Sequence, residues 1–102
     1  MKRIINGKMY NTETANRIAA YDNGCPHNDF NYYREELYLK RTGEFFLYGE
    51  GGPATIYCNV YDDGCTGFGW DIIPLELHEA KSWCERHLSA DRYVEIFGEV
   101  EE

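Results

Sequence analysis

The sequence predicts a single α+β domain in which a small, mainly antiparallel sheet packs with about three helices. Its 102 residues are the size of one domain. Two apolar segments on either side of a Thr-Gly pair, Tyr33 to Lys40 and Glu44 to Tyr48, are typical of a β hairpin. Apolar residues then recur at helical spacing from Leu75 to Leu88. We therefore predict one domain over residues 1–102, ending in a short acidic C-terminal tail.

Strand signals open the chain and fill its middle. Asn6-Gly7 lies between short apolar segments, which indicates a hairpin, because both central positions of a type I′ turn need a positive φ. In the central hairpin, apolar side chains occupy both faces, so each face should pack on another element. A further strand is predicted from Trp70 to Leu75. Ala54 to Tyr61 fits either a strand or an irregular segment.

Three helices are predicted. The first runs from about Thr12 to Asp22, with apolar residues on one face. The second runs from about Leu75 to Leu88. The third, Ala90 to Phe97, begins after Ser89 as its N-cap and ends at Gly98. The apolar face of the first helix holds Ala15, Ile18 and Ala19.

A glycine-rich segment, Gly49-Glu50-Gly51-Gly52-Pro53, follows the central hairpin. No Lys-Ser or Lys-Thr pair comes after it, and its glutamate would repel phosphate, so we exclude a nucleotide-binding loop. We interpret its glycines as a bend or bulge with positive φ values. In such a rigid turn Glu50 is a candidate for contact with a partner.

The charge balance excludes some classes of protein. Acidic residues outnumber basic ones by 18 to 10, for a net charge of −8, which argues against direct binding of nucleic acid. Aromatic residues make up 16% of the chain, too many for a disordered acidic tail. The sequence has neither a membrane-spanning stretch nor the apolar region of a signal peptide. We therefore expect a cytoplasmic protein.

Cysteines and histidines are the candidates for a metal site. Without a secretion signal, free thiols are favoured over disulfides. None of the spacings is the C-x₂-C doublet typical of zinc sites, so we favour buried or loop thiols. A zinc site and a Cys58–Cys65 disulfide are the alternatives, and we assign no metal ligand and no cofactor. The zinc candidates are Cys25, His27, Cys58, Cys65, Cys84 and His87.

An enzymatic site is less well supported. Cys84, His87 and Asp91 offer a nucleophile, a base and an acid, but the acid lies beyond Ser89, and no glycine-rich oxyanion segment is evident. Acids scattered along the chain are typical of solvated turns. We predict a protein that is not an enzyme, with a small enzyme lacking a recognisable motif as the third hypothesis. The scattered acids are Asp29, Asp62, Asp63 and Asp71.

Several stretches together carry a resemblance. They are Ile5 to Ala15, Glu36 to Tyr38, Phe46 to Pro53, Ile72 to Leu75, Glu79-Ala80 and Trp83. The chain resembles a family of small acidic, mostly uncharacterised proteins of bacterial chromosomes and mobile elements. Small acidic mobile-element proteins include inhibitors of CRISPR effectors, so the resemblance implies an inhibitor and transfers no catalytic residue.

The leading hypothesis is a non-enzymatic inhibitor that binds a nucleic-acid-handling protein. Carboxylates on a rigid domain can present phosphate-like spacings to a basic groove. The most concrete target is a Cas9-type CRISPR nuclease, blocked in DNA loading or cleavage. The alternative is a host-regulatory module that binds a peptide or protein through the central hairpin and the Gly49 to Pro53 bend, in which case the charge serves solubility. Candidate partner-binding residues are Glu35, Glu36, Glu50, Asp62, Asp63, Asp71 and Glu99.

Overall fold

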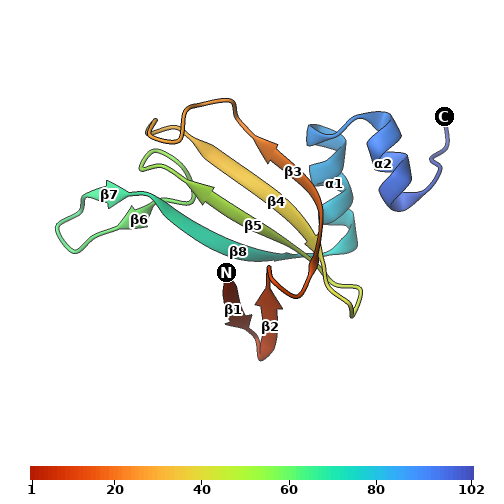
Figure 1. The fold of residues 1–102 in the computed structure, drawn as a ribbon, viewed down its shortest axis with the longest axis horizontal. Coiled ribbons are helices and arrows are strands. Elements are labelled where there is room, and N and C mark those ends of the chain that lie inside the picture. The colour runs from red at the N-terminus through yellow and green to blue at the C-terminus, as the bar shows by residue number, and fades with distance from the viewer.

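The computed structural model describes residues 1–102 and is built around a four-stranded antiparallel sheet (Figure 1). Its strands are β3 (Asn16–Asp22), β4 (Tyr33–Leu39), β5 (Phe45–Gly51) and β8 (Gly69–Leu75), arranged in the order β3-β4-β5-β8. The predicted central hairpin corresponds to β4 and β5, which pair from Tyr33↔Gly51 to Leu39↔Phe45. The predicted α+β class and the antiparallel sheet are confirmed.

A separate hairpin forms the N-terminus. It consists of β1 (Lys2–Ile5) and β2 (Lys8–Asn11), joined by a turn in which Asn6 has φ 51° and Gly7 has φ 78°. Both central residues therefore adopt the left-handed conformation that the Asn-Gly pair predicts.

The segment that the sequence left undecided, residues 54–61, is irregular up to Cys58. Only its end is extended, as the two-residue strand β6 (Asn59–Val60), which pairs with β7 (Thr66–Gly67) in a small hairpin. This hairpin lies at one end of the molecule, and the C-terminus lies at the other (Figure 1).

Two helices follow the sheet. α1 (Leu77–His87) begins two residues later than predicted, because Leu75 is still paired with Phe45 of the sheet. α2 (Ala90–Phe97) has the predicted bounds, and the Ser89 hydroxyl caps it by accepting a hydrogen bond from the Arg92 amide at 3.2 Å. Neither helix is long and apolar enough to cross a membrane.

The predicted first helix, Thr12 to Asp22, is wrong, which leaves two helices instead of about three. Its first residues form a turn, in which the Asn11 side chain accepts a hydrogen bond from the Glu13 amide at 2.9 Å. The rest is strand β3, paired along β4. A register shift between Arg17 and Ala19 lets Ile18 and its neighbour Ala19 both pack on the helix-side core. That bulge conceals the alternation by which a strand is recognised.

The core lies on both faces of the sheet, as the apolar pattern of the central hairpin predicts. On the face toward α1, the buried residues are Leu37, Leu47, Ala80, Trp83 and Cys84. On the opposite face, covered by the N-terminal hairpin, they are Tyr10, Tyr38, Phe46 and Ile72. The Tyr10 and Phe46 rings meet edge to face, with centroids 5.5 Å apart.

The glycine-rich segment corrects another prediction. Gly49 and Gly51 continue strand β5, and neither of them nor Gly52 has a positive φ. Glycine is required at these positions because atoms of neighbouring segments lie where a Cβ would be. A Cβ built on Gly49 would overlap the Tyr57 ring, and one on Gly52 would lie 2.6 Å from the Phe30 carbonyl oxygen. The glycines therefore permit close packing of a loop on the sheet and do not make a bend.

Candidate functional site: the loop end and the Glu35 pocket

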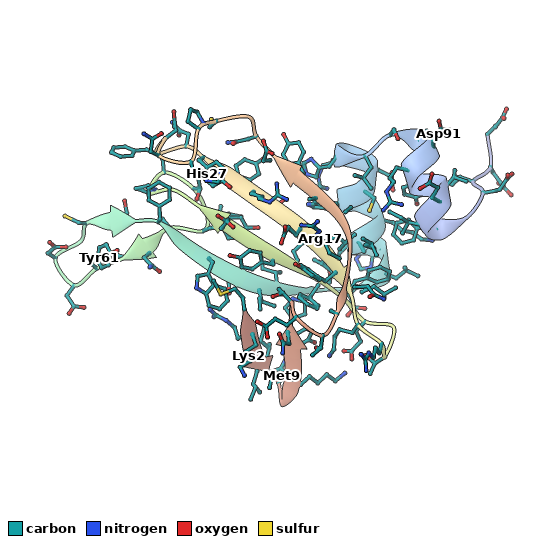
Figure 2. The ribbon with its side chains drawn as sticks, viewed as in Figure 1. Lys2, Met9, Arg17, His27, Tyr61 and Asp91 are labelled. Carbon is teal, nitrogen blue, oxygen red and sulfur yellow. The ribbon has the colours of Figure 1, made fainter.

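The acidic residues predicted to bind a partner do not form one patch. Asp62 and Asp63 lie in the turn between β6 and β7, whereas Glu99 lies in the C-terminal segment. These segments are at opposite ends of a molecule whose longest extent is 50 Å. Figure 2 labels Tyr61 and Asp91, which mark the two ends.

Glu36 lies on the sheet face opposite α1 and is neutralised by its neighbours. Its carboxylate contacts Arg17 at 2.9 Å and Arg34 at 3.2 Å, and it accepts a hydrogen bond from the Tyr38 hydroxyl at 3.0 Å. Burial acts to raise the pKa of Glu36, but hydrogen bonds from Arg17, Tyr38 and Arg34 outweigh it, so the pKa is lowered. This carboxylate therefore links neighbouring strands of the sheet through Arg17, Arg34 and Tyr38.

Two other predicted acids also have partners within the chain. Asp71 pairs with Arg3 at 3.3 Å, and this guanidinium lies over the Trp70 ring, 4.9 Å from its centroid. Glu50 is half-buried and accepts a hydrogen bond from the Tyr48 hydroxyl at 3.4 Å. Of the predicted set, only Asp62, Asp63 and Glu99 are exposed, and the others are partly buried.

One end of the sheet presents apolar side chains to solvent. We call it the loop end: residues 23–32 together with 52–68, which include the β6–β7 hairpin. The two loops are joined by hydrogen bonds from the Ala54 amide to the Phe30 carbonyl at 2.9 Å and from the Gly52 amide to the Tyr32 carbonyl at 2.8 Å. Its exposed apolar side chains are Phe30, Ile56, Val60, Tyr61 and Phe68, with Ile56 84% exposed.

The loop end is also acidic. It contains Asp29, Asp62 and Asp63 and has no lysine or arginine. The Asp63 carboxylate accepts a hydrogen bond from the Cys65 amide at 3.0 Å, which lowers its pKa and keeps it ionised. Exposed apolar groups beside uncompensated negative charge are typical of a surface that binds a basic protein.

Glu35 is positioned differently from the other acids. It alternates with Leu37 along β4, so its side chain lies on the α1 face. The Trp83 indole N–H donates to its Oε1 at 2.8 Å, and the Tyr57 hydroxyl donates to its Oε2. Glu35 thus joins the helix, the sheet and the loop end.

The Glu35 pocket is a cavity of about 440 Å³ beside this carboxylate. It is bounded by strand β4 and by the loop that follows β5, which is part of the loop end. Because that loop packs on Gly49, the glycine-rich segment positions the cavity. The residues that line the Glu35 pocket are Asn31, Tyr33, Glu35, Ala54, Thr55, Ile56 and Tyr57.

An aromatic cluster surrounds the inner side of Glu35. The His87 ring lies 4.0 Å from the Tyr21 ring and 5.0 Å from the Trp83 ring, measured between centroids. Burial lowers the pKa of His87, against an opposing effect of Glu35. The imidazole is therefore neutral at pH 7 and does not balance the Glu35 charge.

The sulfur groups do not form a site. All four cysteines are free, so the alternative of a Cys58–Cys65 disulfide is wrong. No group of three His, Cys, Asp or Glu residues is placed to hold a metal ion. Cys84 is fully buried, and burial raises the pKa of its thiol to about 11, which keeps it protonated and weakly nucleophilic at neutral pH.

Sequence reasoning found Glu35 but missed its neighbours. Tyr57 and Trp83 lie 22 and 48 residues away along the chain, so no local motif connects them to Glu35. The available signal was alternation, which places Glu35 on the same face as Leu37, where an unassisted carboxylate would be costly.

The chain matches no protein-family model, no curated protein and no solved structure. Its functional assignment therefore depends on the loop end, the Glu35 pocket and their charges.

Proposed function

We propose that the protein is a non-enzymatic inhibitor that docks its loop end onto a basic surface of a nucleic-acid-handling protein. The observation that carries the proposal is the coincidence, on one end of the sheet, of exposed apolar side chains with acids and no lysine or arginine. Apolar anchors supply most of the affinity of protein interfaces, whereas complementary charge increases the association rate and selects the partner.

The charge indicates the kind of partner. Proteins that hold nucleic acids do so with lysine- and arginine-rich grooves that neutralise phosphates. A surface bearing Asp62 and Asp63 is attracted to such a groove and competes there with DNA or RNA. The narrower proposal is a cytoplasmic Cas9-type CRISPR nuclease blocked in DNA loading or cleavage. Its support is the acidity of the chain and the resemblance to acidic mobile-element proteins.

The proposal is tested by DNA cleavage with a Cas9-type nuclease, at increasing concentrations of the protein and over a salt series. We expect inhibition that weakens as salt rises, because charge steers the encounter. The double variant Asp62→Asn/Asp63→Asn should inhibit less at low salt. Its matched control, Glu101→Gln/Glu102→Gln, removes the same charge at the far end and should inhibit as well as the wild type.

A second variant tests the apolar contribution. Ile56→Ser changes a side chain that is 84% exposed, so folding should be unaffected. We expect it to weaken inhibition about tenfold at every salt concentration, the size of effect typical of an interface anchor. Cleavage that is unchanged by a large excess of wild-type protein at every salt concentration would rule out this nuclease. Equal loss in both charge variants would show that the loop end is not the docking surface.

A further inference from the structure

The Glu35 carboxylate has no counter-ion within the chain. It takes part in none of the ion pairs of the structure, and its hydrogen-bond partners, Tyr57 and Trp83, are neutral donors. Each carboxylate oxygen therefore accepts one hydrogen bond and keeps capacity for another. A half-buried carboxylate without a cation is costly, and a cation that entered the Glu35 pocket would meet no competing positive group there.

The walls of the pocket favour the same class of ligand. Tyr33 and Tyr57 both line it, so aromatic side chains lie beside the carboxylate. Aromatic faces carry negative electrostatic potential and attract organic cations, most strongly where water is partly excluded. An anion would be repelled by Glu35. The volume of about 440 Å³ accommodates an alkyl chain together with its charged head.

The shape of the cation is also constrained. Guanidinium groups bind carboxylates best when both oxygens are open to a planar fork. Here Oε1 already accepts from Trp83 and Oε2 from Tyr57. Each oxygen keeps one free lone pair, so a planar guanidinium would have to align with both of these at once, whereas a compact ammonium needs only one; the alkylammonium is therefore the less constrained ligand for this carboxylate.

We propose that the Glu35 pocket binds an alkylammonium group, supplied by a lysine side chain of the protein on which the loop end docks. The assignment of the lysine to a partner rests on the proposed function. The pocket lies at the loop end, with Ile56 on its rim, so a partner that buries the exposed apolar side chains also covers the pocket.

The test uses n-butylammonium as the probe and the indole N–H resonance of Trp83 as the readout. This group donates to Glu35 at 2.8 Å and should shift in a saturable manner as the ammonium binds. Trp70 packs on the opposite face of the sheet and is the internal reference. We expect no comparable shift with n-butanol, which has the same alkyl chain without the charge.

Variants separate binding from folding. Glu35→Gln should abolish the response, whereas Glu50→Gln, which removes a half-buried carboxylate from the opposite face of the sheet, should leave it intact. If Glu35→Gln fails to fold, Tyr33→Leu is the second variant. It keeps the carboxylate and removes an aromatic wall, so we expect butylammonium to bind about threefold or more weakly.

The possible outcomes distinguish this inference from the proposed function. Absence of a saturable Trp83 shift, an equal shift with n-butanol, or full binding by Tyr33→Leu overturns the alkylammonium site, whatever the nuclease assay shows. Butylammonium binding without nuclease inhibition supports the site and rejects that partner. Inhibition fully retained by Glu35→Gln overturns the assignment of the ligand as a partner lysine.

Discussion

Gly49 is the residue at which a side chain should be least tolerated, because the Tyr57 ring occupies the space of its Cβ. We expect Gly49→Ala to destabilise the protein by about 1–3 kcal/mol, the usual cost of overpacking, and to displace Tyr57 from Glu35. Urea unfolding measures the first effect, and the Trp83 indole resonance reports the second. In a double-mutant cycle with Tyr57→Ala, the cost of Gly49→Ala should fall sharply. Additive costs would contradict this packing account.

Glu44 predicts a pH dependence. Hydrogen bonds from Lys8 (3.1 Å), Thr42 (3.0 Å) and Lys40 (3.2 Å) lower its pKa to about 2. The unfolded value is about 4.3, so the stabilisation is complete above that pH and is lost as the pH falls toward 2. The difference in Tm between wild type and Glu44→Gln should therefore shrink over this range, at low salt because the group is on the surface.

The matched control for that measurement is Glu13→Gln, which removes an exposed carboxylate that forms no ion pair. Its Tm should follow that of the wild type between about pH 2 and pH 4.3. A difference between wild type and Glu44→Gln that stays constant across the range would show that Glu44 does not join the N-terminal hairpin to the sheet through its charge.

At the scale of elements, α2 depends on its N-cap. Ser89→Ala removes the acceptor for the Arg92 amide and should destabilise the protein by about 1 kcal/mol. The control is Ser82→Ala at an exposed position within α1, where alanine should be neutral or slightly stabilising. Urea unfolding followed by circular dichroism compares the two. Equal stability of both variants would contradict the capping role.

Elements with local signals were predicted from sequence, and the element without one was not. The Asn6-Gly7 turn and the Ser89 cap each depend on residues within a few positions of one another. Strand β3 depends instead on pairing with β4 and carries a bulge, so the spacing of Ala15, Ile18 and Ala19 resembled one face of a helix. Tertiary pairing overrides a weak helical preference of this kind.

At the scale of the whole molecule, the same contrast applies to the candidate site. The acidity of the loop end can be read from the sequence, because Asp62 and Asp63 are adjacent and no lysine or arginine is near them. The Glu35 pocket cannot, because it forms only when the loop after β5 packs against β4, and because the Trp83 donor to Glu35 comes from α1, far along the chain. The sequence therefore identified Glu35 as a candidate for partner binding on the surface, but not the pocket beside it.

The helix-to-sheet core gives a prediction for the whole molecule. Cys84 is fully buried in the core with Leu37 and Leu47 and also borders the pocket between α1 and α2, so a thiol reagent can reach it only when the helices move away from the sheet or from each other. The triple variant Cys25→Ser/Cys58→Ser/Cys65→Ser keeps Cys84 as its only thiol. We expect Cys84 to be labelled more slowly the larger the free energy of global unfolding is. That free energy is measured independently by urea. The companion variant that keeps only Cys65, which is exposed, should be labelled at the rate of a free thiol. Equal labelling rates in the two variants would mean that the helices open locally around Cys84, because global unfolding of a domain with ~5–15 kcal/mol of stability is too rare to produce rates as fast as those of an exposed thiol.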